Sequence, residues 1–173
     1  MTFLQTRPGG KANHGHVVIV GIGEMKVGHS RTDVLVARSL GSCLGLTLYD
    51  EEKQVGGLIN CMLPLAGIDP DQARDKPGMF VDSGVEALLK EIHALGGRSG
   101  NLVARMAGAG LPLGGRGALG IGHRNELAMR RILQENDIPL LGEDVGGFGS
   151  RSLYLYLKDG RTMVESHGKE VEL

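Results

Sequence analysis

The stretch CLGLTLYDEEKQVGGLINC, residues 43–61, decides the fold. It holds two apolar runs of strand length that flank the polar segment 51–54. Two such runs around a short polar connection are typical of a β-hairpin. If 51–54 forms a four-residue loop, Asp50 pairs with Val55 on the neighbouring strand. The hairpin therefore sets the register of two adjacent strands.

This register places the two cysteines of the chain on opposite faces of the sheet. Cys43 falls opposite Met62, and Asn60 becomes its diagonal neighbour on the same face, because side chains alternate along a strand. Cys61 then points to the other side. A shift of one residue would exchange Asn60 and Cys61 between the two faces, so the site prediction depends on this pairing.

The rest of the chain adds strands and helices without a regular alternation. Apolar residues at helical spacing predict a helix over 81–95, with a capping box of Ser83 and Glu86 and a stop at Gly96. A second helix is predicted over 125–136. Further strands are predicted at 16–24, 33–37, 101–107 and 138–144, and in two runs within 150–166 around a type I′ Asp159-Gly160 turn. The fold class is α/β: mixed β-sheets packed with two main helices.

Three further segments complete the expected organisation of the chain. Residues 1–15 are predicted to form a flexible N-terminal tail, and 16–173 a single domain. The β-branched run at the start of 16–24 predicts a strand buried on both faces. Residues 64–79 are rich in Pro and Asp and predict a long loop, and the acidic end 169–173 is expected to be solvated surface.

Composition excludes several classes of function. The net charge of −1 and the lack of a Lys or Arg run argue against nucleic-acid binding, and no apolar segment is long enough for membrane insertion. Two cysteines and no signal-peptide pattern indicate a cytoplasmic protein. The glycine-rich stretches 20–28 and 108–117 lack the lysine of a phosphate-binding loop, and His14 and His16 lack partner ligands. No cofactor or metal site is predicted.

Cys43 is the candidate nucleophile because it directly follows a Gly-Ser turn. Backbone N–H groups of Gly41, Ser42 and Cys43 that meet no other acceptor would lower a thiol pKa and hold an oxyanion. Free cysteine is also among the residues most often buried without any function. The residues alone leave both interpretations open.

Dispersed motifs connect the sequence to a known family. In order and spacing the chain resembles the CheD family of chemotaxis proteins from about residue 17 to 164. The matching motifs are LGSCLGLTLYD, GGLINCMLP, DKPGMFVDSGVEALL, AGAG, IGHRN and LLGEDVGG, with IGE near the start. The resemblance implies a cysteine-hydrolase fold similar to that of the cytotoxic necrotizing factor toxins.

The resemblance also implies an activity and partners. Members of the CheD family are chemoreceptor glutamine deamidases, in which a thiolate attacks a side-chain amide and water hydrolyses the thioester to leave glutamate. Cys43 matches the nucleophile. The implied partners are the cytoplasmic domains of methyl-accepting chemotaxis receptors and a CheC-type phosphatase, and no cofactor is implied.

Two catalytic positions of the family differ in this chain. Asn60 stands where the family has a histidine base, and Ala37 stands where it has a supporting threonine. Because an asparagine amide takes up no proton near neutral pH, two hypotheses follow: an active deamidase, or a weakened or inactive module that binds receptors and CheC. His123 and His29 are candidates for a replacement base.

Overall fold

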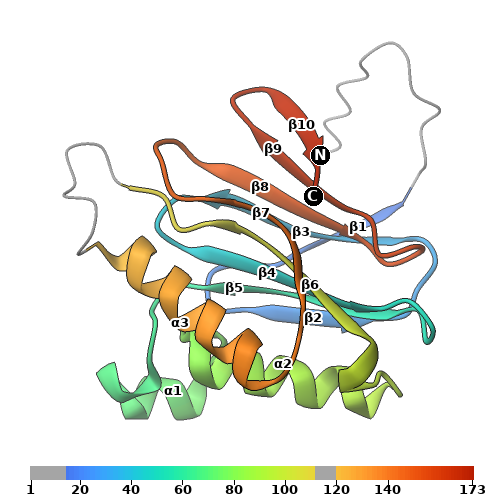
Figure 1. Ribbon diagram of the computed structural model, residues 1–173, viewed down its shortest axis with the longest axis horizontal. Helices are drawn as coiled ribbons and strands as arrows, with labels where there is room; N and C mark the ends of the chain where they lie inside the picture. The colour runs from blue at the N-terminus through green and yellow to red at the C-terminus, as the bar shows by residue number, and fades with distance from the viewer. Residues whose placement is uncertain (1–14, 112–119) are drawn as a thin grey trace.

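The strands form two five-stranded sheets in the computed structural model, which describes residues 15–111 and 120–173 (Figure 1). The predicted tail lies outside the described residues except for Gly15. The first sheet has the order β1 (His16–Ile19), β3 (Asp33–Leu40), β8 (Arg151–Tyr156), β9 (Thr162–Ser166) and β10 (Lys169–Glu172). The second has the order β2 (Met25–Gly28), β5 (Val55–Cys61), β4 (Leu44–Asp50), β6 (Leu102–Gly108) and β7 (Leu140–Val145).

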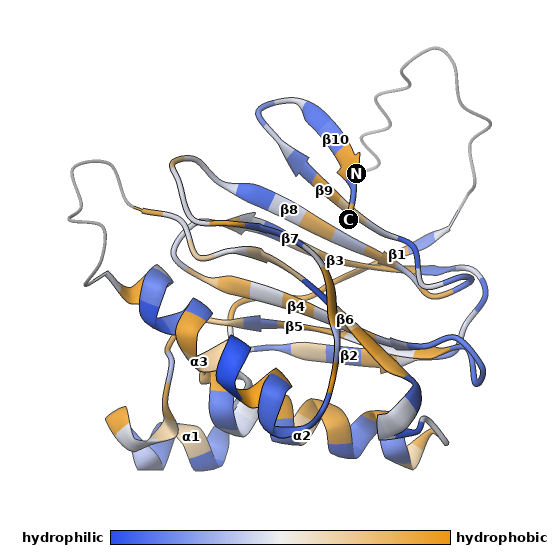
Figure 2. Ribbon diagram, in the orientation of Figure 1, coloured by the Kyte–Doolittle hydropathy of each residue, from blue (hydrophilic) through white to orange (hydrophobic). Residues whose placement is uncertain are grey.

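Helices cover the outer face of the second sheet, so the molecule has three layers (Figure 1). The helices are α1 (Pro70–Asp75), α2 (Val81–Ala94) and α3 (Ile121–Glu135), with short 3₁₀ turns at Ala66–Ile68, Pro77–Met79 and Ser99–Asn101. Apolar residues of α2 and α3 face the sheet and polar ones face outward (Figure 2). None of the described helices is long and apolar enough to span a membrane.

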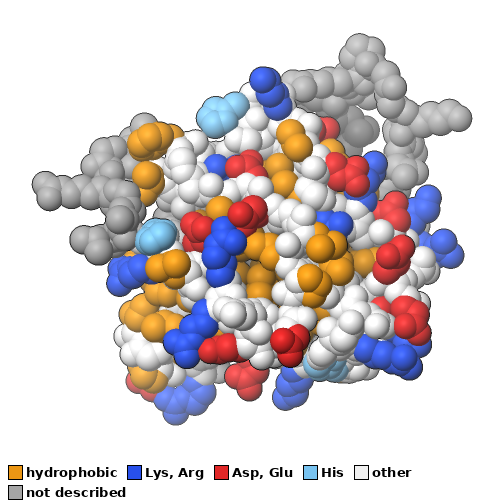
Figure 3. Space-filling view, viewed as in Figure 1, with side chains coloured by type: hydrophobic (Ala, Val, Ile, Leu, Met, Phe, Trp, Pro, Cys, Tyr) orange, Lys and Arg blue, Asp and Glu red, His pale blue; other side chains and the backbone are white. Residues whose placement is uncertain are grey.

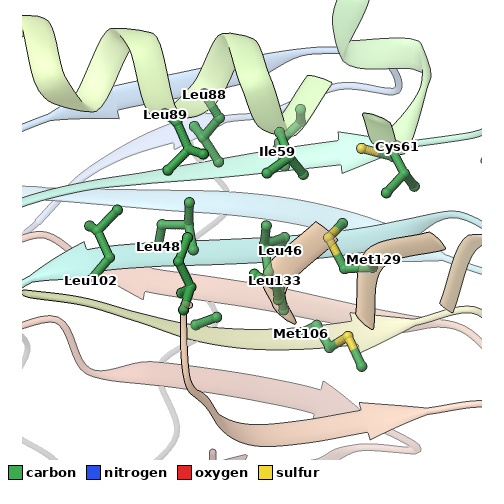
Figure 4. Packing of buried hydrophobic residues seen from close by; sticks show 14 of the residues in the cluster. Leu46, Leu48, Ile59, Cys61, Leu88, Leu89, Leu102, Met106, Met129 and Leu133 are labelled. Atoms are coloured by element: carbon green, nitrogen blue, oxygen red, sulfur yellow. The ribbon is translucent and has the colours of Figure 1, made fainter. Parts of the chain in front are cut away.

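Two hydrophobic cores separate the three layers. The inter-sheet core lies between the sheets and includes Leu35, Leu40, Leu58, Leu153 and Leu155. The helix-side core lies between the second sheet and the helices, and includes Leu46, Leu48, Ile59, Leu88 and Met129 (Figure 4). Strands β4 and β5 are buried at every position because they are covered on both faces.

The central hairpin is confirmed. Asp50 pairs with Val55, and Leu44 pairs with Cys61 at the other end of the ladder. The ladder ends at this pair, and Cys43 and Met62 are the next residues beyond it. Cys61 packs in the helix-side core and Cys43 packs against the inter-sheet core, so the predicted placement on opposite faces is also confirmed.

The single-domain α/β fold with two main helices is confirmed, and α2 begins at Val81 as predicted. The capping box is wrong: α2 begins after Phe80 with no side-chain cap, and the Ser83 hydroxyl donates to the Pro77 carbonyl. The 3₁₀ turn before α2 places Ser83 inside the first helical turn. Helix α3 begins at Ile121, four residues before the predicted start.

The first strand differs from the prediction in its burial. Strand β1 is covered on one face only: Val17 and Ile19 are exposed, whereas Val18 on the other face is partly buried against the inter-sheet core. It lies at the edge of the first sheet and pairs in parallel with β3 alone. Strand β2, which continues the same stretch of sequence, joins the second sheet instead. The predicted strand 16–24 therefore ends at Ile19, and β2 is a separate strand that was not predicted.

The turns and the C-terminal segment also differ. The turn at Gly160 is not of type I′, because positive φ occurs at Gly160 but not at Asp159. Positive φ at two consecutive residues occurs instead at His167 and Gly168, which connect β9 to β10. The segment 169–172 is thus exposed surface, as expected, but it also forms the paired strand β10. The predicted loop 64–79 contains α1 and two 3₁₀ turns.

Candidate active site

A three-residue turn, Gly41 to Cys43, joins β3 to β4 and carries the candidate nucleophile. The end of β6 holds two of its carbonyl groups. The N–H of Gly110 donates to the Gly41 carbonyl at 2.7 Å, and the N–H of Ala109 donates to the Cys43 carbonyl at 2.8 Å. The turn is therefore fixed by backbone contacts on the side of β6.

The N–H groups of the same turn point elsewhere. Among the described residues, those of Gly41, Ser42 and Cys43 meet no hydrogen-bond acceptor. Because the C=O and N–H of one trans peptide point in opposite directions, anchoring the Gly41 carbonyl directs the Ser42 N–H away from β6. Free donors grouped in this way suit an anion such as a thiolate or an oxyanion. Their catalytic use stays a prediction.

Asn125 from α3 holds the third carbonyl of the turn. Its side chain is completely buried, and its Nδ2 donates to the carbonyls of Ser42 and Met62, each at 3.0 Å. One amide thus joins the start of β4 to the end of β5. The Oδ1 atom is buried and meets no donor among the described residues.

The sequence predicted a helix through Asn125 but no contact with the turn. The available signal was its position four residues before Met129 and eight before Leu133, which places an amide on the buried face of α3. A polar residue on such a face requires a partner. The partners lie 83 and 63 residues away in the sequence, so spacing alone does not identify them.

Replacing Asn125 is expected to loosen the turn. Asn125→Ala leaves the partly buried carbonyl bonds of Ser42 and Met62 without their donor, so the free energy of unfolding should fall by about 1–3 kcal/mol. Iodoacetamide should alkylate Cys43 faster as the turn opens. Asn136→Ala is the matched control, because the exposed Asn136 amide bonds only within its own helix end. Chemical denaturation and alkylation kinetics that match the wild type would contradict the role assigned to Asn125.

The two thiols differ in accessibility. Cys43 is half-buried, and this burial raises the pKa of its thiol above the ordinary value. Cys61 is fully buried; its burial, followed by the nearby Cys43 and Asp82, raises its pKa further. Both groups are therefore thiols rather than thiolates at neutral pH, and only Cys43 is exposed to reagents.

Asn60 occupies the position diagonal to Cys43. It pairs with Gly45 across the ladder and is 2% exposed. Its Nδ2 lies 3.5 Å from the Val20 carbonyl, and its buried Oδ1 meets no donor in the described parts of the chain. The side chain can donate and accept hydrogen bonds but cannot act as a proton acceptor.

Neither candidate histidine is placed as a base by a described contact. Strand β2 pairs with β5 as far as Gly28, which lies opposite Gly56. His29 follows Gly28, so it lies about 13 Å or more from Asn60 along the direction of β5. His123 lies in the first turn of α3, two residues before Asn125. Residues two apart project about 200° from each other around a helix, so His123 points away from the face that holds the turn.

The site thus combines an accessible thiol with grouped backbone donors, and it lacks an ionisable partner among the described residues. Such a site can form a covalent bond to an electrophilic carbon and stabilise the resulting oxyanion. The described residues also contain no cluster of three or more His, Cys, Asp or Glu side chains that could hold a metal ion.

Known proteins identify the family of this chain. A family model described as CheD chemotactic sensory transduction matches residues 62–166. A probable chemoreceptor glutamine deamidase CheD of Solibacter usitatus is 39% identical over 90% of this chain and 92% of its own length. A probable chemoreceptor glutamine deamidase CheD 2 of Anaeromyxobacter dehalogenans is 40% identical over 87% of this chain and 94% of its own length. A probable chemoreceptor glutamine deamidase CheD of Archaeoglobus fulgidus is 36% identical over 91% of this chain and 98% of its own length. The chain belongs to the CheD family.

Proposed function

We propose that this protein is a chemoreceptor glutamine deamidase that uses Cys43 as its nucleophile. The observation that carries the proposal is the turn at Cys43, where three carbonyls are anchored and three N–H groups are left free among the described residues. The relatives that match nearly the whole chain are probable chemoreceptor glutamine deamidases, and they suggest the reaction and the substrate.

The proposed reaction replaces a carboxamide by a carboxylate in two steps. The Cys43 thiolate attacks the amide carbon of a receptor glutamine, and the free N–H groups of the turn stabilise the oxyanion that forms. The C–N bond then breaks, and ammonia leaves with a proton from the surroundings. Water hydrolyses the thioester, which gives glutamate and restores the thiol.

The protonation steps are the slow part of this reaction. Burial raises the pKa of Cys43, which lowers the fraction of thiolate at neutral pH, and Asn60 supplies no proton acceptor. Solvent must therefore take the thiol proton and supply one to the leaving group. General acid–base help is typically worth about 10²–10⁴ in rate, so turnover is expected to be slow and to increase with pH.

The same observation favours a second candidate function. A protein that keeps the turn but lacks a base is suited to bind receptors or a CheC-type phosphatase without turning over. On either candidate function the protein acts in the cytoplasm, where the signalling domains of the receptors lie. Calorimetry with purified CheC and receptor fragments, run beside the activity assay below, separates the two functions.

Cys43→Ala is expected to abolish deamidation. Purified receptor cytoplasmic fragments are incubated with the protein at pH 9, where more of the thiol is ionised, and ammonia and the Gln-to-Glu mass change are followed. Cys61→Ala is the matched control: Cys61 is sealed in the helix-side core, so this variant should retain wild-type turnover. No conversion by the wild type after long incubation would leave binding as the function, and equal conversion by Cys43→Ala would exclude Cys43 as the nucleophile.

A further inference from the structure

An apolar groove lies beside the candidate site, between α3 and the segment that follows β5. It encloses about 370 Å³. Five of its seven lining residues are apolar: Pro64, Leu65 and Ile68 from the segment after β5, and Leu127 and Ala128 from α3. No segment of the described chain covers this groove.

Large apolar side chains at this groove are unusually exposed. Met62, Leu65, Ile68 and Leu127 are all exposed, from 41% for Met62 to 54% for Leu127. Single exposed apolar residues are normal, but a gathered group marks a site of interaction. Figure 3 shows hydrophobic side chains gathered at the lower left, over α1 and the first part of α3.

The charge at the groove has one sign. Arg124 and Arg131 line it, and no carboxylate does. Arg131 pairs with Glu135, whereas Arg124 makes no ion pair within the described residues. The two arginines are seven residues apart on α3, about 10 Å along the helix. A partner segment with apolar side chains and carboxylates complements this surface.

The groove adjoins the contact that anchors the turn at Cys43. Pro64 of the groove follows Met62 by two residues, and Asn125 holds both the Ser42 and the Met62 carbonyls. Asn125 and Arg124 are adjacent residues of α3. A chain that lies in the groove is therefore next to the residues that anchor the turn.

We infer that this groove binds the acidic, partly apolar segment of the chemoreceptor that flanks the target glutamine. The inference rests on the proposed function and adds to it the surface that selects the substrate. Apolar contacts with Leu65, Ile68 and Leu127 supply affinity, and Arg124 orients the segment through its carboxylates. The nucleophilic turn itself makes little contribution to recognition.

Binding is tested in the Cys43→Ala background, so that no turnover interferes. Leu127→Asp and Arg124→Glu are expected to weaken binding of receptor cytoplasmic fragments at least tenfold by calorimetry, and Arg124→Glu should reduce its salt dependence. The matched controls are Leu141→Asp, an equally exposed leucine on β7, and Lys158→Glu, a cation after β8. Both controls should bind within twofold of the parent, and all four variants should keep its thermal midpoint.

Each remaining outcome decides the inference. Unchanged binding in the groove variants, or no binding by the parent, overturns it. A dimer in sedimentation that Leu127→Asp dissociates also overturns it, because a second copy then covers the groove. If the groove substitutions weaken receptor binding but the protein with Cys43 releases no ammonia, the groove is supported as a receptor-binding surface and the deamidase activity is overturned. Ammonia release at the same rate with and without the groove substitutions supports the deamidase and overturns the groove as the surface that binds the substrate.

Discussion

Asn60→His is expected to raise the rate of receptor deamidation by about 10²–10⁴ at neutral pH, the usual worth of a positioned acid–base group. The hairpin register places position 60 diagonal to Cys43 on the same face. An imidazole there can take the thiol proton and return it to the departing ammonia. The present asparagine can do neither.

The environment of Asn60 is suited to orient a histidine. The Asn60 amide already points toward the Val20 carbonyl, and an imidazole N–H that donates to this oxygen would leave its other nitrogen free to accept a proton. Ala37 is buried in the inter-sheet core on β3. Adding Ala37→Thr, which introduces the supporting threonine that the resemblance to the family implies, should increase the gain further.

The pH profile distinguishes acid–base catalysis from a general change in the protein. The wild-type rate should increase through pH 9, because burial holds the pKa of Cys43 above its ordinary value and thiolate accumulates only as the pH rises. The Asn60→His profile should level off near neutral pH. Asn136→His, which adds a histidine at the exposed end of α3, is the control and should keep the wild-type profile. A folded Asn60→His protein without gain would show that position 60 no longer supports catalysis.

The sequence predicted the central hairpin correctly because its signals are local. The polar loop fixes the pairing of Asp50 with Val55, and the alternation of side chains then places Cys43 and Cys61 on opposite faces. Strand β10 was missed, because a short acidic segment at the chain end resembles solvated surface. Its signal was the His167-Gly168 turn, where the glycine tolerates positive φ.

The candidate site was predictable only in part. Cys43 and the free donors of its turn follow from a local Gly-Ser sequence. The contacts that anchor this turn come from β6 and α3, whose residues lie far away in the chain. Composition and periodicity place Asn125 on a helix, but which carbonyls it meets depends on how three layers pack together.

Gly108→Ala is expected to reduce turnover by about 10²-fold, the effect of roughly 1 Å of misplacement at a reacting group. Gly108 ends β6 with a φ of 111°. A Cβ there would overlap the Cys43 carbonyl oxygen and approach the Leu40 Cβ to 3.2 Å. Because the obstructing atom belongs to the backbone of the nucleophile, no side-chain rotation relieves the contact. The turn must move, and its N–H groups move with it.

Gly96→Ala separates this displacement from ordinary backbone strain. Gly96 has a similar φ of 92°, follows α2 far from the turn in sequence, and has no neighbouring atom within 4 Å of an added Cβ. It should therefore lose about 1–3 kcal/mol of stability from the left-handed backbone alone and keep its turnover once folded. Denaturation curves and turnover are measured for both variants under conditions where each is fully folded. Equal turnover in the two would mean that the position of the Cys43 turn does not limit the reaction.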